Sequence, residues 1–106
     1  MRTAATLLLM LAPCVVALAA DDVQLLRQLG YVAGQAVACD IEEPDIAAQV
    51  ATAMADAMGL TDEASHTVMI DQALRAAAGP CAAPAGRLEE VRTNWKAMRR
   101  RAGLDR

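Results

Sequence analysis

The chain has 106 residues and a net charge of −3, with 56% hydrophobic but only 2% aromatic residues. This length fits one domain, and a core of Ala, Leu, Val and Met without phenylalanine favours closely packed helices. The same composition argues against a β-sandwich, whose strands are rich in β-branched and aromatic residues.

The N-terminal segment has the pattern of an export signal. Arg2 precedes an almost wholly apolar run over residues 4–18, and the motif Ala17-Leu18-Ala19 follows the A-x-A cleavage pattern. The run is shorter than the ~20 residues that span a bilayer, which distinguishes it from a membrane helix.

We therefore predict a signal peptide over residues 1–20, cleaved after Ala19 or Ala20. The mature domain would then comprise residues 21–106 and be periplasmic or secreted. An uncleaved anchor is the alternative.

The chain contains three cysteines. Cys14 lies within the signal in an imperfect lipidation motif, because Pro13 occupies a position that normally holds a small residue; a lipid anchor there is a minor alternative. Cleavage leaves Cys39 and Cys81, and a cysteine pair in a small exported chain predicts a disulfide. By the loop-length relation this bridge stabilises the fold by ~4 kcal/mol. Two distant cysteines and one histidine make a poor zinc site, so we expect no metal and no cofactor.

Hydrophobic spacing and capping residues predict an all-α fold, a small four-helix bundle with helices at about 22–38, 44–58, 62–78 and 87–101. In an up-down-up arrangement the first and third helices end on the same side of the bundle. A bridge between Cys39 and Cys81 is therefore geometrically reasonable.

The spacing also predicts which helix faces are buried. The first helix has an apolar stripe of Leu25, Leu29, Val32, Ala36 and Cys39. The third helix has a stripe of His66, Ile70, Ala73, Leu74 and Ala77. Small residues form a second stripe on the first helix, at Gly30, Gly34 and Ala38. Because glycine destabilises a helix interior, we expect another helix to approach closely there.

Two features have sharper alternatives. The acidic turn over residues 40–45 suits helix capping, whereas a calcium loop would need a glycine and a ligand spacing that this turn lacks. His66 is the only histidine, and we expect it to lie on a helix flank without chemistry. An enzyme using His66 would need a pocket around it and a carboxylate within hydrogen-bonding reach.

Charge is unevenly distributed along the chain. Residues 21–84 hold ten acidic and two basic residues, whereas residues 85–106 hold three acidic and seven basic residues. The basic C-terminal helix at 87–101 carries a narrow apolar stripe around Trp95. Either this stripe closes the bundle, with the arginines near the acidic turn, or the helix is partly detached and binds an anionic lipid surface or an acidic protein.

In the second case the binding residues would be Arg92, Trp95, Lys96, Arg99, Arg100 and Arg101. We do not expect nucleic acid as a partner, because export removes the usual target and only one aromatic residue is available for stacking.

The sequence contains no clustered nucleophile, base and acid, so we expect a protein that acts by binding and is not an enzyme. Membrane-surface binding, or binding of an envelope protein through the basic helix, is one alternative. A stress-protective or chaperone-like role in the bacterial cell envelope is another, by analogy of size, compartment and single bridge.

Overall fold

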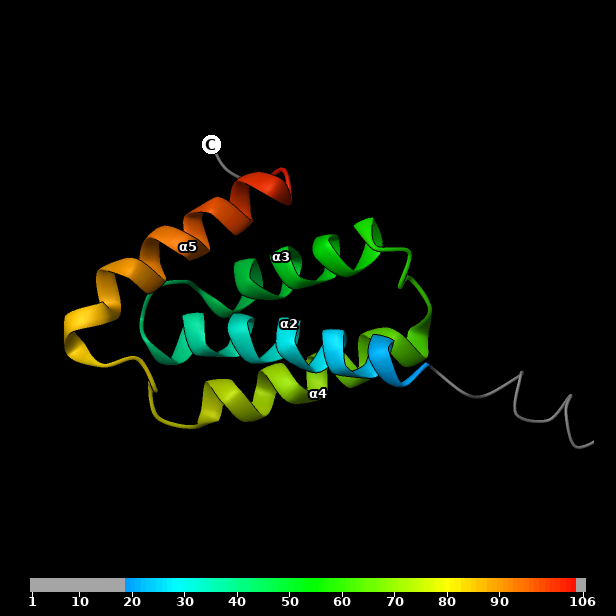
Figure 1. Cartoon of the computed structure of the whole chain (residues 1–106), viewed down its shortest axis with the longest axis horizontal. Helices are drawn as coiled ribbons and strands as arrows, with labels where there is room; N and C mark the ends of the chain where they lie inside the picture. Colours follow the sequence, from blue (N-terminus) through cyan, green and yellow to red (C-terminus); the bar gives the residue numbers. More distant parts are fainter. Residues whose placement is uncertain (1–18, 105–106) are drawn as a thin grey trace, which may run out of the picture.

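The computed structural model describes residues 19–104, which form four α-helices and one short 3₁₀ turn (Figure 1). The elements are α2 (Ala20–Ala38), α3 (Pro44–Ala57), α4 (Glu63–Ala78), η1 (Ala85–Arg87) and α5 (Leu88–Arg101). The predicted all-α class and four helices are confirmed, and every boundary agrees to within two residues. The predicted signal peptide and Cys14 lie almost wholly outside the described residues, and no described helix is long and apolar enough to cross a membrane.

The helices are arranged around α2, which packs against both α3 and α4. The backbones of α3 and α4 approach each other less closely than either approaches α2, but their side chains share one core. α5 lies on the side of α3 away from α4 (Figure 1). The fold is thus a three-helix core to which α5 is added at one edge.

Local capping explains where the helices end. Asp40 after α2 and Gly59 after α3 have positive φ values of 58° and 81°, and each lets the following amide donate back into the helix (Ile41 N to Ala36 O, Leu60 N to Ala55 O, both 2.9 Å). At the start of α4, the Asp62 carboxylate accepts bonds from the amide and hydroxyl of Ser65, at 3.2 and 2.6 Å. The bond from the Ser65 hydroxyl is the main cause that holds the pKa of Asp62 below its usual value.

The two glycines of α2 lie against the backbone of α4. A Cβ atom at Gly30 would be 2.3 Å from the carbonyl oxygen of Met69, and one at Gly34 would be 2.3 Å from that of Ala73. Only a residue without a side chain allows this separation, so the predicted close approach is confirmed and α4 is the partner helix.

Replacing Gly34 with alanine tests this contact. Because the new methyl group would collide with the backbone of Ala73, we expect Gly34→Ala to lower the free energy of unfolding by about 2 kcal/mol, measured by urea denaturation. At a helix position without this contact, the same change would increase stability through helix propensity. A Cβ atom at Gly86 would have no neighbour within 4 Å, so Gly86→Ala is the matched control, with a change below ~0.5 kcal/mol. Equal stability of the two variants would contradict the close approach.

The predicted buried faces of α2 and α4 are partly wrong. Leu25 and Val32 of the predicted α2 stripe are 42% and 40% exposed, whereas Leu26 and Ala33 are buried. On α4, Leu74 is 66% exposed, and the buried residues are Ser65, Met69 and Ala76. The physical reason is the glycine contact: the helices approach most closely where α2 has no side chains, and this rotates the larger apolar residues of both stripes away from the interface.

The predicted disulfide is confirmed. Cys39 at the end of α2 is bonded to Cys81 beyond α4, with a Cα–Cα distance of 4.8 Å. Gln35, one turn before Cys39, binds the same segment: its Nε2 donates to the carbonyl of Pro80 at 3.1 Å, and its Oε1 accepts from the amide of Ala82 at 2.7 Å. The chain between α4 and η1 is therefore fixed to α2 by both covalent and hydrogen bonds.

Candidate functional site

The basic helix α5 is attached to the acidic turn by three side chains, Glu42, Trp95 and Arg99, which we call the α5 clasp. The indole nitrogen of Trp95 donates to Oε1 of Glu42 at 3.0 Å, and Nη1 of Arg99 lies 3.2 Å from the same oxygen. Oε2 of Glu42 accepts from the amide of Glu43 at 3.1 Å. The Glu42 side chain is only 9% exposed, and Trp95 is 3% exposed.

Burial makes the clasp more than a surface ion pair. A carboxylate withdrawn from water needs compensating donors, and Glu42 receives an indole, a guanidinium and an amide. Trp95 adds the largest apolar side chain to the same contact. Of the two arrangements that the sequence allowed, the described structure has the one in which Trp95 closes the bundle and an arginine reaches the acidic turn.

Removing Glu42 tests whether the clasp holds α5. We expect Glu42→Ala to lower the free energy of unfolding by about 2 kcal/mol, because the Trp95 and Arg99 donors lose their shared acceptor. As Trp95 is the only tryptophan, its fluorescence emission should shift to the red as the indole gains contact with water. The exposed neighbour provides the control, Glu43→Ala, which should leave the emission maximum unchanged. An unshifted spectrum in Glu42→Ala would show that the clasp does not hold the helix.

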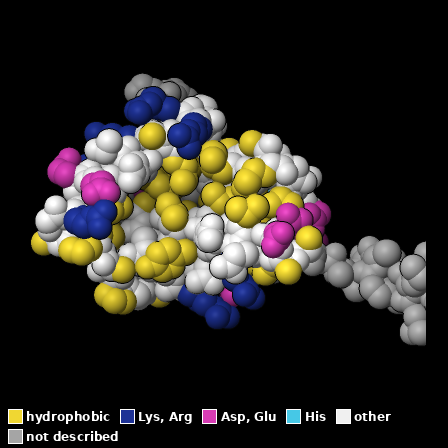
Figure 2. Space-filling model, viewed as in Figure 1, with side chains coloured by type: hydrophobic (Ala, Val, Ile, Leu, Met, Phe, Trp, Pro, Cys, Tyr) yellow, Lys and Arg dark blue, Asp and Glu magenta, His cyan; other side chains and the backbone are white. Residues whose placement is uncertain are grey.

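The six predicted binding residues of the basic helix are divided between two sides of α5. Trp95 and Arg99 face the bundle, and Arg92 forms an ion pair with Glu89. Lys96, Arg100 and Arg101 are exposed and have no ion-pair partner within residues 19–104. Lys and Arg side chains accordingly gather over α5 in the space-filling view (Figure 2).

A second surface feature lies where α3 and α4 diverge from α2, and we call it the α3–α4 groove. Its deepest part is an apolar pocket of about 100 Å³. The walls come from all three helices and include Val37, Ala47, Ala48, Ile70, Leu74 and Ala77. One wall is thus the α4 stripe of Ile70, Ala73, Leu74 and Ala77, in which Leu74 is exposed and the other three are half-buried.

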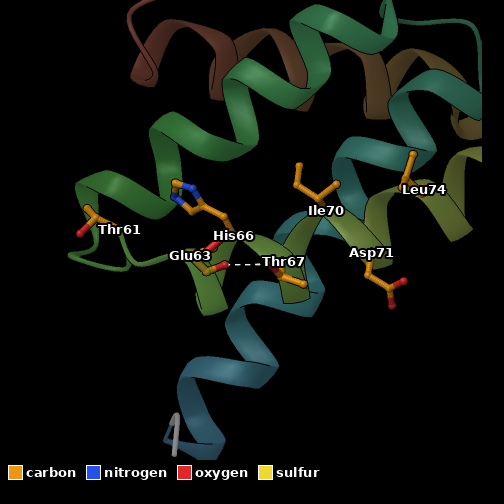
Figure 3. A pocket seen from close by; sticks show the side chains of 7 residues that line it. All are labelled: Thr61, Glu63, His66, Thr67, Ile70, Asp71 and Leu74. Atoms are coloured by element: carbon orange, nitrogen blue, oxygen red, sulfur yellow. Dashed lines mark hydrogen bonds between the residues drawn. The ribbon is translucent and has the colours of Figure 1, made fainter. Parts of the chain in front are cut away.

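Beside the pocket, an open hollow of about 640 Å³ lies along the start of α4 (Figure 3). Its lining comes from Thr61 and α4 alone, and it shares Ile70 and Leu74 with the apolar pocket. His66, Ile70 and Leu74 project from α4 toward α3 in this view. The hollow also has two carboxylates, Glu63 and Asp71, in its lining. The apolar pocket and this more acidic hollow thus adjoin at Ile70 and Leu74.

His66 bridges α4 and α3 within the hollow. Its Nε2 lies 3.0 Å from Oδ1 of Asp56 near the end of α3, and the imidazole is 30% exposed. This pair has the pocket and the carboxylate that acid–base chemistry at His66 would require. The two neighbouring hydroxyl groups are already used in local structure, because Ser65 donates to Asp62 and Thr67 donates to the carbonyl of Glu63. The pair joins the end of α3 to the start of α4.

The part of the chain that the structure describes contains no group of three or more His, Cys, Asp or Glu side chains that could hold a metal ion. In the acidic turn, Glu42 is engaged with Trp95 and Arg99. The calcium alternative therefore loses its most buried carboxylate.

Sequence reasoning missed Glu42, Gln35 and the α3–α4 groove. Glu42 is one of several acids in its turn, and nothing local distinguishes it from Glu43. The groove did leave a signal: α4 carries two apolar stripes at helical spacing, one through Met69 and Ala76 and one through Ile70 and Ala77. A helix with two such stripes needs cover on two sides.

No family model, no curated protein and no solved structure matches this chain. The clasp, the basic face and the groove are therefore interpreted from their own geometry and chemistry.

Proposed function

We propose that the protein is exported and acts by binding another molecule through the α3–α4 groove, without catalysing a reaction. The observation that supports this most directly is the exposed Leu74 of α4, which continues a half-buried apolar stripe. Leu74 is 66% exposed and stands at the edge of an apolar pocket to which α2, α3 and α4 all contribute. Isolated exposed leucines are common on proteins, but one that borders a concave apolar surface is typical of a binding site.

The size of the pocket suits one apolar group. An engineered protein cavity of ~150 Å³ holds benzene, so a pocket of about 100 Å³ has room for roughly one aliphatic side chain. Burying such a group removes apolar surface from water on both partners and contributes ~25 cal/mol for each Å². The groove thus offers an anchor point rather than an enclosed ligand cavity.

Nile red, a neutral apolar dye, can test binding at the groove. We expect its fluorescence to increase on titration with the protein, and Leu74→Ser to weaken the dye affinity several-fold, because the serine removes apolar surface from the groove edge. The control is Leu25→Ser, which changes an exposed leucine of α2 outside the groove and should leave the affinity unchanged. Equal affinities for both variants would show that the groove is not the binding site.

Export is supported by the Cys39–Cys81 bridge, which oxidising compartments favour, and by the start of α2 at Ala20, beside the predicted cleavage sites. The full chain produced in a bacterial host should be recovered from the periplasmic or secreted fraction. Mass spectrometry should show an N-terminus at Ala20 or Asp21 and the mass of the oxidised cysteine pair. A cytoplasmic chain that retains residues 1–20 would contradict export.

Binding of an anionic lipid surface or an acidic protein by α5 is the second candidate. The observation in its favour is the exposed group of Lys96, Arg100 and Arg101, of which Lys96 and Arg100 are one helical turn apart. Trp95 is held by Glu42 inside the bundle, so this binding would depend on charge and not on insertion of the indole.

Anionic vesicles of phosphatidylglycerol and phosphatidylcholine test this candidate. Each basic residue near such a surface contributes ~1 kcal/mol, so replacing Lys96, Arg100 and Arg101 with Gln should weaken vesicle binding more than tenfold. The matched control removes the same charge from three arginines that are already in ion pairs, Arg75, Arg87 and Arg92. Co-sedimentation at low and high salt measures the difference, and equal loss in both variants would exclude a specific role for the outer face of α5.

A further inference from the structure

Building on the proposed binding function, we propose that the α3–α4 groove receives a cationic amphipathic helix from another protein. Its apolar face would cover the apolar stripe of α4, and its Lys or Arg side chains would face the acidic residues along the edges of the groove.

The helical form of the partner follows from the packing of the bundle. In a four-helix bundle, two helices that lean on a third leave a channel that a fourth helix fills. Here α3 and α4 both pack on α2 and are joined to each other by the His66–Asp56 pair, and α5 occupies the far side of α3 (Figure 1). Among the described residues, no element covers the side of α3 and α4 that carries the apolar pocket beside Leu74, so a further helix could lie there.

The dimensions of the groove agree with a short helix. The linings of the hollow and the apolar pocket together extend along α4 from Glu63 to Ala77, and at a rise of 1.5 Å per residue these two positions are about 21 Å apart. A partner segment of roughly four turns would match this length. Binding of this kind depends on apolar anchors at helical spacing, and the pocket beside Leu74 would receive one of them.

The charge of the partner follows from the groove edges. Glu63 and Asp71 line the α4 side. On α3, Asp45 precedes the lining residue Ala48 by three positions and so shares its side of the helix, and Asp56 lies across from His66. Two of these four acids are paired within residues 19–104: Asp56 with His66, and Asp71 with Arg75.

This distribution disfavours anionic partners and favours cationic ones. Acidic edges repel lipid phosphates, nucleic acids and acidic peptides, whereas they attract Lys and Arg side chains placed on either side of an apolar stripe. The acidic groove lies on α3 and α4, and the basic outer face lies on α5. The protein therefore has two separate charged surfaces of opposite sign.

Three labelled peptides of about 15 residues test the proposal by fluorescence anisotropy with the full mature, oxidised protein. The first carries a Leu stripe at helical spacing flanked by Lys, the second has the same stripe flanked by Glu, and the third has the composition of the first in an order without a stripe. We expect the first to bind at least tenfold more tightly than either of the others.

Variants of the protein locate the site. Leu74→Ser should weaken the Lys-flanked peptide about tenfold. The double change Glu63→Gln and Asp71→Asn should weaken it several-fold and reduce its salt dependence. Glu89→Gln with Glu90→Gln removes the same charge from α5, outside the groove, and should have no effect.

The outcomes separate this proposal from the proposed function. If Nile red binding depends on Leu74 but the Lys- and Glu-flanked peptides bind equally, the groove is a binding site and its preference for a cationic helix is wrong. If the stripeless Lys peptide binds as well as the striped one, the interaction is only electrostatic and the helix proposal is also wrong. If Leu74→Ser changes the affinity for neither Nile red nor the peptide, the groove is not a binding site, and both the proposed function and the cationic helix proposal are wrong.

Discussion

The contact between the glycine stripe of α2 and the backbone of α4 determines most of what is unusual in this fold. Because Gly30 and Gly34 have no side chain, the carbonyl groups of Met69 and Ala73 pack directly against the backbone of α2. This contact fixes how both helices are rotated about their axes. Met69 is then fully buried, while Leu74, five residues on, is turned outward. The groove between α3 and α4 is a consequence of that rotation, because the stripe that would otherwise enter the core forms the groove wall instead.

The fold could be read from the sequence to a large extent, and the site could not. Helix limits depend on local signals such as Pro44, Asp62 and Gly59, which act within a few residues of where they stand. The disulfide followed from counting cysteines and matching helix ends. Helix rotation is different, because the hydrophobic spacing of α2 allows either of two adjacent faces to be buried. The face with the glycines is the buried one, and the face with Leu25 and Val32 is exposed, because the backbone of α4 packs against the glycines. The sequence of α2 alone does not contain this information.

The same distinction applies to the charges. The sequence shows an acidic region followed by a basic helix, and it leaves open whether that helix packs on the bundle or is partly detached. It does not show that one carboxylate, Glu42, accepts from both Trp95 and Arg99, or that the exposed positive charge is thereby reduced to one face of α5. Glu42 and Trp95 are 53 positions apart in the sequence. Whether two such side chains meet depends on the three-dimensional packing of their helices, which the composition of the two segments does not reveal.

The hydrogen bonds of Gln35 have a consequence for the redox behaviour of the protein. They hold the backbone of Pro80 and Ala82, on either side of Cys81, without involving sulfur. If a reductant opens the bridge, the thiol of Cys81 is thus retained beside that of Cys39 and meets it at a high effective concentration. Reoxidation would then proceed within one folded molecule and restore the original pairing, in preference to mixed disulfides with other thiols in the same compartment.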